Sequence, residues 1–191
     1  CPNITVFKGE GRFVANDDGS ASRTIEVAME SGGTEQLTGR HIVLGAGARP
    51  FIPPYPGIED VDYHTSDSVM RLDALPERLI LFGGGYIASE LGHVFAGLGS
   101  HVTLINRGER LLRAEDDEIA ERFTEVYADR FDLKCGSTVN RVWQDADGIH
   151  VALTRNGVDE QVDGDVVLVS TGRVPNGDLL DVCLLYTSDA A

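Results

Sequence analysis

The sequence has few cysteines and few basic residues, and both shortages exclude classes of protein. Its three cysteines, Cys1, Cys135 and Cys183, are odd in number and far apart, which argues against a disulfide framework or zinc site and favours a reducing cytoplasm. Lysine and arginine number 16 against 31 aspartates and glutamates, giving a net charge of −15. A polyanion is not attracted to nucleic acid or anionic membranes. No apolar run approaches the ~18 residues of a transmembrane helix, so we expect neither nucleic acid nor a membrane as a partner.

What the chain does contain is typical of a folded domain with many tight turns. Hydrophobic residues make up 42% and charged residues 25% of its 191 residues, which are ordinary values for a globular protein. Its 22 glycines are about 12% of the chain, against a usual ~7%. This excess indicates positions where the backbone turns sharply or passes close to another group.

The first third of the chain predicts an antiparallel meander followed by a stiff connector. Short apolar runs separated by turn residues predict strands, at residues 4–7, 11–15, 24–29, 35–38 and 40–44. Four prolines between Pro50 and Pro56 then mark a plausible domain boundary. Residues 66–72 are expected to form a short helix.

After Pro76 the pattern becomes that of an α/β domain. The apolar run 79–82 is typical of a buried parallel strand, and a glycine-rich turn and a helix over 86–98 follow it. Further strands and one more helix are predicted, at 101–105 (strand), 117–129 (helix), 138–144, 150–154, 160–162 and 166–169 (strands). The expected fold class is therefore α/β, a Rossmann-like domain with a parallel sheet, together with the meander of the first third.

The glycine-rich turn has the spacing of a dinucleotide-binding fingerprint. Gly83 permits the tight turn, Gly85 lets the backbone approach a pyrophosphate, and the small Ala88 lets helix and strand pack closely. The helix start would direct unpaired N–H groups at the phosphates. A strand precedes the turn and a helix follows it, as the fingerprint requires. A purely structural glycine turn is the alternative.

The residues after the next strand favour NADPH over NADH. An NAD site places an acid where this chain has the neutral Asn106, and Arg107, Arg110 and Arg113 follow. Guanidinium groups are always charged and bind a 2′-phosphate in a bidentate manner. The alternative is a solvated loop whose arginines pair with neighbouring acids, namely Glu109, Glu115 and Asp116.

Three segments in order resemble the pyridine nucleotide-disulfide oxidoreductases, which are FAD enzymes. These segments run from Ile42 to Gly57, from Gly83 to Glu90 and from Val167 to Asn176, and the resemblance covers residues 1–182. Within the family, the motifs around His64, Gly92 and Arg107 to Arg113 are most similar to the mycothione reductases. Gly108 departs from the histidine common in glutathione reductase-like members, which puts one phosphate contact in doubt.

The resemblance also implies roles for individual residues. Tyr86 would match an aromatic lid over the flavin, with a packed core aromatic as the alternative. Glu90, which shares the helix face of Tyr86, would match an acid beside the nicotinamide, with an exposed helix acid as the alternative. Ile87, between Tyr86 and Ala88, would belong to the same cofactor site. Gly47 and Gly172 would let the backbone pass close to cofactor, or they are ordinary strand-end glycines.

The resemblance finally implies an activity and a domain plan. Residues 1–65 would be part of an FAD domain, 66–172 the NAD(P)H domain, 173–182 the return to the FAD domain, and 183–191 a non-native tail. The parent protein would be a homodimer that passes hydride from NADPH to FAD and electrons to a cysteine pair, which reduces a small-molecule disulfide. The cysteine pair and its His-Glu base are not in this chain, so it would be inactive alone. Dihydrolipoyl dehydrogenase, a mercuric reductase-like flavoprotein or a non-catalytic NADPH-binding module are the alternatives.

Overall fold

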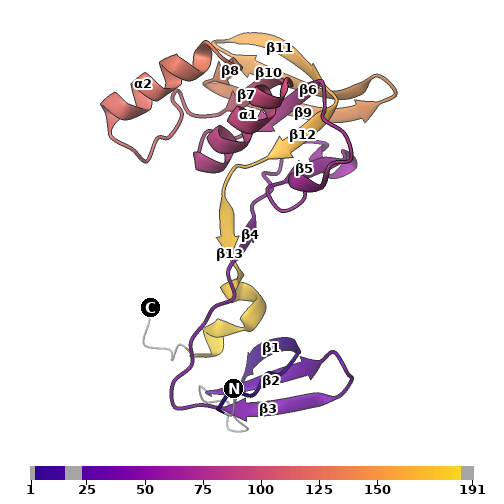
Figure 1. Ribbon diagram of the computed structural model, residues 1–191, viewed down its shortest axis with the longest axis vertical. Coiled ribbons are helices and arrows are strands. Elements are labelled where there is room, and N and C mark those ends of the chain that lie inside the picture. Colours follow the sequence, from indigo (N-terminus) through magenta and orange to yellow (C-terminus); the bar gives the residue numbers. More distant parts are fainter. Residues whose placement is uncertain (1–2, 16–22, 186–191) are drawn as a thin grey trace. The chain divides into compact units, whose positions relative to one another are not determined.

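The computed structural model describes residues 3–15 and 23–185, in two compact units (Figure 1). The larger unit comprises residues 50–173, and the smaller comprises residues 1–49 with 174–191. The predicted tail at 183–191 lies outside the described residues from 186 onward. Within the part that the structure describes, no helix is both long and apolar enough to span a bilayer.

A five-stranded parallel sheet forms the centre of the larger unit. Its strand order is β5-β12-β6-β7-β8. The strands are β5 (Tyr63–Thr65), β6 (Arg78–Phe82), β7 (His101–Asn106), β8 (Asp132–Cys135) and β12 (Val166–Val169). The middle strands are nearly continuous apolar runs because both faces of the sheet are covered.

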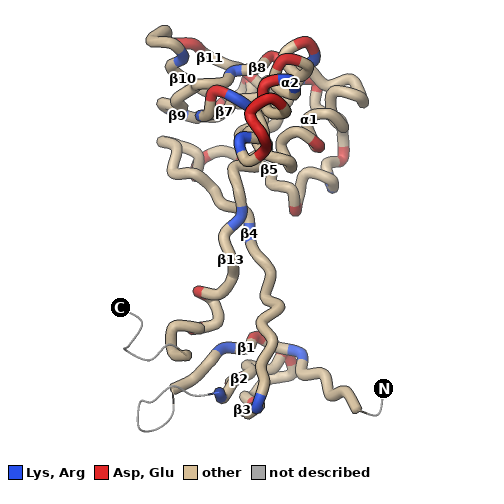
Figure 2. Tube along the Cα trace, turned by 90° about the vertical axis from the view of Figure 1, so that its left-hand side faces the viewer, with Lys and Arg blue, Asp and Glu red and all other residues tan. Residues whose placement is uncertain are grey.

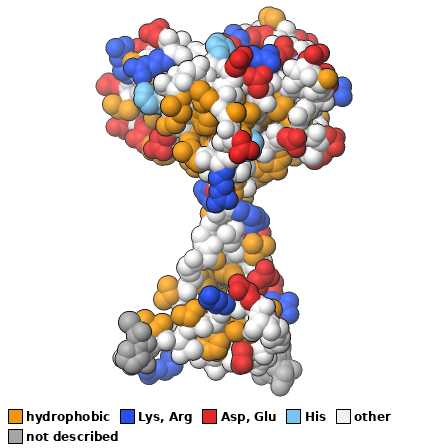
Figure 3. All heavy atoms as spheres, turned by 45° about the vertical axis from the view of Figure 1, so that its right-hand side comes forward, with side chains coloured by type: hydrophobic (Ala, Val, Ile, Leu, Met, Phe, Trp, Pro, Cys, Tyr) orange, Lys and Arg blue, Asp and Glu red, His pale blue; other side chains and the backbone are white. Residues whose placement is uncertain are grey.

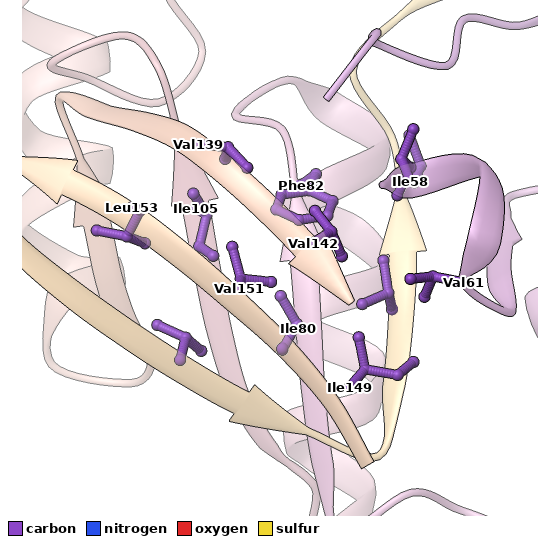
Figure 4. Close-up of a cluster of buried hydrophobic side chains, with 13 residues drawn as sticks. Ile58, Val61, Ile80, Phe82, Ile105, Val139, Val142, Ile149, Val151 and Leu153 are labelled. Carbon is purple, nitrogen blue, oxygen red and sulfur yellow. The ribbon is translucent and has the colours of Figure 1, made fainter. Parts of the chain in front are cut away.

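Successive residues of these strands enter two separate hydrophobic cores. Leu79 and Leu81 of β6 pack with Ala88 and Phe95 of helix α1 (Tyr86–Leu98). Ile80 and Phe82 face the other way and pack against a three-stranded antiparallel sheet (Figure 4). That sheet has the order β11-β10-β9 and consists of β9 (Ser137–Asp145), β10 (Gly148–Arg155) and β11 (Val158–Gly164). The alternation follows from the two-residue period of a strand.

Two helices connect the parallel strands, and both are predicted by the sequence, whereas the short strand β8 that follows the second helix is not. Helix α1 links β6 to β7 and ends at Gly99, which adopts the left-handed conformation with a φ of 111°. Helix α2 (Asp117–Ala128) links β7 to β8 and carries several acidic side chains (Figure 2). Acidic and basic side chains are nevertheless intermingled on the face of residues 50–173 seen in Figure 3.

The smaller unit is built on a three-stranded antiparallel sheet. Its strands are β1 (Gly9–Val14), β2 (Thr24–Met29) and β3 (Thr34–Thr38). The guanidinium of Arg49 makes two hydrogen bonds to the Asp178 carboxylate, at 2.7 and 2.9 Å. A further two-stranded sheet consists of β4 (Ala48–Pro50) and β13 (Arg173–Pro175).

The structure differs from the sequence-based expectation at several elements. The expected strands 4–7 and 40–44 do not form, and the helix expected at 66–72 is a 3₁₀ turn over Val69–Arg71. Val6 and Val43 are 74% and 93% exposed, because a strand needs a hydrogen-bonded neighbour and these segments have none among the described residues. The larger unit begins at Pro50, the first of the prolines that mark a boundary in the sequence, and the division after residue 65 that the resemblance implies stays a prediction.

Candidate dinucleotide-binding site

The glycine-rich turn lies at the carboxyl edge of the parallel sheet. Strands β6, β7 and β12 run parallel and side by side, so the residues that follow each of them meet at this edge. The chain runs from β6 through α1 to β7 on one side, and β12 joins β6 on the other. This change of direction is the topological switch point at which open α/β sheets bind ligands.

A different structural feature explains each of the three glycines of the turn. Gly83 has a φ of 130°, and a Cβ there would lie 2.5 Å from the Ser170 carbonyl oxygen. A Cβ on Gly84 would lie 2.6 Å from the side-chain amide of Asn106. A Cβ on Gly85 would meet nothing within 4 Å, so the space above this residue is open. The first two glycines are needed for packing, and the third leaves room for a ligand.

The start of helix α1 is suited to an anion. The first intrahelical bond runs from the Ser89 N–H to the Gly85 carbonyl, so the preceding N–H groups have no helical partner. No side chain caps this end. Ala88 is fully buried, Ile87 is half-buried and Glu90 is exposed. The donor set and the open space at Gly85 therefore fit a pyrophosphate.

Residues 107–116 form a loop that is fixed against the glycine turn. The Asn106 side-chain amide donates to the carbonyls of Gly108 and Arg110, at 2.9 and 3.0 Å. The Leu112 N–H donates to the Gly84 carbonyl at 2.7 Å, and Leu112 has a φ of 49°. The Leu111 N–H donates to the Thr124 hydroxyl of α2 at 2.9 Å. These bonds hold the loop in place without any ligand.

The three arginines of this loop divide into one that is paired and two that are not. Arg110 contacts Asp117 at 2.6 Å and Glu121 at 3.1 Å, and these bonds raise its pKa. Arg107 and Arg113 are exposed and form no ion pair within the described part of the chain. The acids that the alternative interpretation named as arginine partners, Glu109, Glu115 and Asp116, pair with none of the three. Two guanidinium groups therefore remain available beside the glycine turn.

Tyr86, the first residue of α1, is 56% exposed and is not a packed core aromatic. Its hydroxyl donates a hydrogen bond to the Glu115 carboxylate of the loop. This hydrogen bond and the charge of Glu115 raise the pKa of Tyr86. Tyr86 thus connects the helix start to the arginine loop.

The two predicted glycines outside the turn adopt conformations that favour glycine. Gly47 has a φ of 67°, and its carbonyl accepts a hydrogen bond from the Asn176 N–H at 3.0 Å. Gly172 has a φ of 133°, and its carbonyl accepts from the Phe51 N–H at 2.9 Å. A Cβ on either would meet nothing within 4 Å. The positive φ angles explain why glycine occupies both positions. The contact of these residues with a cofactor stays a prediction.

Sequence reasoning missed three contributions to this site. Gly84 must be small because of Asn106, Leu112 joins the loop to the turn through its backbone, and Glu115 bonds Tyr86. Each is a contact between segments distant in sequence, so no local pattern could reveal it. The described residues include no group of three or more His, Cys, Asp or Glu placed to hold a metal ion.

Comparison with known proteins gives one matching family and several relatives. The family described as pyridine nucleotide-disulphide oxidoreductase matches residues 2–189. The chain is 40% identical over 180 residues to the mycothione reductase of Mycobacterium tuberculosis, covering 94% of this chain and 38% of that protein. It is 38% identical over 181 residues to a mercuric reductase of Lysinibacillus sphaericus, covering 94% of this chain and 31% of that protein. The chain therefore spans about a third of the length of these relatives.

Solved structures match the fold over most of the chain. The HOCl-induced flavoprotein disulfide reductase of Escherichia coli, as a Cu(II) complex, superposes with a TM-score of 0.81 at 28% identity, covering 96% of this chain and 40% of that one. An engineered water-forming NADPH oxidase bound to NADPH superposes with a TM-score of 0.72 at 26% identity, covering 89% of this chain and 38% of that one.

Proposed function

Because the chain belongs to the pyridine nucleotide-disulphide oxidoreductase family, we propose that it binds NADPH at the glycine turn of an FAD-dependent disulfide reductase. The observation that carries the choice of NADPH is the pair of exposed arginines, Arg107 and Arg113, on a loop fixed against that turn. An NAD-specific site would place a carboxylate at the position of Asn106. Asn106 is neutral, and its amide is used to hold the loop.

The engineered NADPH oxidase supports this choice. In that protein an aspartate is replaced by alanine, the next residue is replaced by arginine, and a second arginine is introduced six residues after the first. Asn106, Arg107 and Arg113 have the same order and spacing in this chain. In both cases a site without the acid and with two arginines is suited to the 2′-phosphate that distinguishes NADPH from NADH.

The residues of this chain have distinct tasks in the proposed site. The N–H groups at the start of α1, from Gly85 onward, would bind the pyrophosphate. Arg107 and Arg113 would bind the 2′-phosphate, and Tyr86 and Glu90 would lie toward the nicotinamide end. When bound, FAD would supply the redox chemistry that links the nicotinamide to a disulfide. Gly47 and Gly172 are proposed to let the backbone pass close to that group.

For the whole protein we propose a cytoplasmic homodimer that reduces a low-molecular-weight disulfide of the mycothione type. The identity of 40% to a mycothione reductase supports this substrate class. A mercuric reductase-like activity is the second candidate, supported by 38% identity over nearly the same residues. We assign residues 50–173 to NADPH binding and the smaller unit to the FAD domain.

Binding titrations of the chain with NADPH and NADH test the cofactor proposal. We expect NADPH to bind more tightly, and the double variant Arg107→Ala with Arg113→Ala to lose NADPH affinity while NADH affinity stays unchanged. A hydrogen bond to a charged group contributes about 1.5–3 kcal/mol, so losing both arginines should cost about 10²-fold or more.

The matched control is Arg122→Ala, which removes an exposed arginine of α2 that pairs only with Glu125 at 3.0 Å among the described residues. It should leave both affinities unchanged. An equal loss of NADPH and NADH affinity in the double variant would contradict the assignment of the 2′-phosphate to these arginines.

A further inference from the structure

Tyr55 is an aromatic residue of the larger unit that lies beside the glycine turn. Its ring packs on that of Phe82 in an edge-to-face arrangement, with the ring centroids 5.2 Å apart. Phe82 is the last residue of β6 and directly precedes Gly83. Tyr55 therefore lies at the carboxyl edge of the parallel sheet, where the cofactor is proposed to bind.

The backbone around Tyr55 is fixed, so the position of its ring is set before any ligand binds. Prolines flank it on both sides and restrict the backbone φ angles. The Tyr55 N–H donates to the Pro53 carbonyl at 2.8 Å, and the Tyr55 carbonyl accepts from the Ile58 N–H at 3.1 Å. The Val142 N–H of β9 donates to the Pro56 carbonyl at 2.8 Å, which attaches the segment to the antiparallel sheet. A ring held in this way loses little freedom when it contacts a ligand.

The hydroxyl of Tyr55 is the part of this side chain that lacks a partner. Tyr55 is half-buried at the margin of the hydrophobic core, yet its hydroxyl forms no hydrogen bond with any residue that the structure describes. Burial raises the pKa of this phenol, and the charge of Arg107 lowers it, which requires the guanidinium to lie near the hydroxyl. Because buried tyrosine hydroxyls usually have a hydrogen-bond partner, Tyr55 offers an unused donor beside Arg107.

We propose that Tyr55 is a cofactor-contacting residue whose hydroxyl donates a hydrogen bond to the 2′-phosphate of NADPH, beside Arg107. The arginine supplies positive charge, and the phenol supplies a neutral donor on a rigid support. NADH has a ribose hydroxyl in place of this phosphate, and a neutral hydroxyl is a weaker acceptor than a charged phosphate. Tyr55 therefore contributes to the choice between the two cofactors. This inference rests on the proposed function, since it concerns the same cofactor site.

Binding titrations with fragments of the cofactor isolate this contact. Adenosine 2′,5′-bisphosphate carries the 2′-phosphate and adenosine 5′-monophosphate lacks it, so the two probes differ only at the proposed acceptor. Tyr55→Phe keeps the ring on Phe82 and removes the hydroxyl. We expect this variant to bind the bisphosphate and NADPH about tenfold more weakly, the effect of losing one hydrogen bond to a charged group, and to bind the monophosphate and NADH as the wild type does. An equal change for both probes, or no loss of affinity for the bisphosphate, would overturn the proposal.

The matched control is Tyr63→Phe, which removes the same hydroxyl group from a different tyrosine. Tyr63 is also half-buried and packs against the same core as Tyr55. It is the first residue of β5, an edge strand that β12 separates from β6. The change should leave the affinities for both probes and both cofactors unaltered. A loss of bisphosphate affinity as large as that of Tyr55→Phe would mean that any hydroxyl removed from this core weakens the site, and would contradict a specific contact.

A second measurement observes the contact in the wild-type chain. With the tyrosine ring carbons labelled, the resonance of Tyr55 is the one of five tyrosine signals that disappears in Tyr55→Phe. This resonance should shift when the bisphosphate is added and shift much less with the monophosphate, because only the bisphosphate places an acceptor at the hydroxyl. An identical shift with both probes would place Tyr55 against the nucleoside and overturn the hydrogen bond to the phosphate.

The two proposals fail in different ways. A wild-type chain that binds neither NADPH nor the bisphosphate would refute the proposed function, and with it this inference. NADPH binding that is weakened by Arg107→Ala but unchanged by Tyr55→Phe would refute the role of Tyr55 alone and leave the proposed function in place.

Discussion

At the scale of single residues, we expect substitution by alanine to have opposite effects on stability at two glycines, Gly84 and Gly97. A Cβ on Gly84 would lie 2.6 Å from the Asn106 amide, which holds the arginine loop through Gly108 and Arg110. Gly97 lies inside α1, and a Cβ there would meet nothing within 4 Å. Gly84→Ala must displace the Asn106 side chain. Gly97→Ala only replaces glycine, which has a low helix propensity, with alanine, which has a high one.

We expect Gly84→Ala to lower the free energy of unfolding by about 1–3 kcal/mol and to reduce NADPH affinity, since the loop shifts with Asn106. Gly97→Ala should raise the free energy of unfolding by about 0.5–1 kcal/mol and leave NADPH affinity unchanged. Urea denaturation and binding titrations of the two variants measure both effects. A Gly84→Ala variant with wild-type stability and affinity would show that Asn106 has no role in holding the loop.

Asn106 illustrates how far the sequence determines the site. The strand-turn-helix pattern around Gly83 predicts where a dinucleotide binds, and the neutral residue at 106 predicts which dinucleotide. The sequence does not show that the Asn106 side chain bonds two carbonyls of the following loop. That contact depends on the path of residues 107–110, which is set by tertiary bonds such as the one from Leu112 to Gly84.

At the scale of elements, the antiparallel sheet β9–β11 contains a histidine held between two aspartates. His150 of β10 contacts Asp163 of β11 at 2.7 Å and Asp145 of β9 at 3.0 Å, and its ring stacks on Trp143. The hydrogen bonds to Asp163 and Asp145 raise the pKa of His150, and the same contacts lower the pKa of each aspartate. The cluster therefore links the stability of this sheet to pH.

The signs of these shifts define a window of pH. A raised histidine pKa stabilises the fold below the unfolded value of about 6.5, and this stabilisation is lost as the pH rises through the folded value. A lowered aspartate pKa stabilises the fold above about 3.9, and this is lost as the pH falls through the folded value. We therefore expect the cluster to contribute most between about pH 4 and pH 6.5.

The measurement is the difference in free energy of unfolding between the wild type and His150→Gln across this range. The difference should be largest near pH 5–6 and should decrease as the pH rises through the folded pKa of His150, which lies above its ordinary value. His101→Gln, at an exposed position at the start of β7, is the control and should show a much weaker dependence. A difference that does not change with pH would mean that His150 stabilises the sheet through packing on Trp143 alone.

The elements that the sequence predicts well are those with a continuous apolar run or a clear apolar period, even where, as for β12, the partner strands β5 and β6 lie far away along the chain. The run 79–82, helix α1 and the strands from residue 137 onward form close to their predicted bounds. The runs 4–7 and 40–44 have strand composition but do not form strands. Composition shows only that a segment suits a sheet, and a strand forms where a neighbour accepts its hydrogen bonds.

At the scale of the whole molecule, the two units differ in how much apolar core they contain. Among the described residues of the smaller unit, Phe13 and Val27 are the buried hydrophobic side chains, at 2% and 6% exposure. The larger unit has two extended cores, one on each face of its parallel sheet. Because hydrophobic burial is the main favourable term in folding, the smaller unit should be the less stable.

This difference should be visible as two unfolding transitions. The single tryptophan, Trp143, lies in β9 and reports only on the larger unit, whereas far-ultraviolet circular dichroism reports strands of both. We expect the dichroism signal to begin its loss at a urea concentration lower by about 1 M or more than the tryptophan fluorescence change. Val27→Ala should move only the first transition, and Val151→Ala, at a fully buried position of β10, only the second. The contrary result would be a single transition, with the same midpoint for both signals, that both variants shift. Because the core of the smaller unit is too small to give an equal midpoint by itself, that result would show that its stability depends on the larger unit.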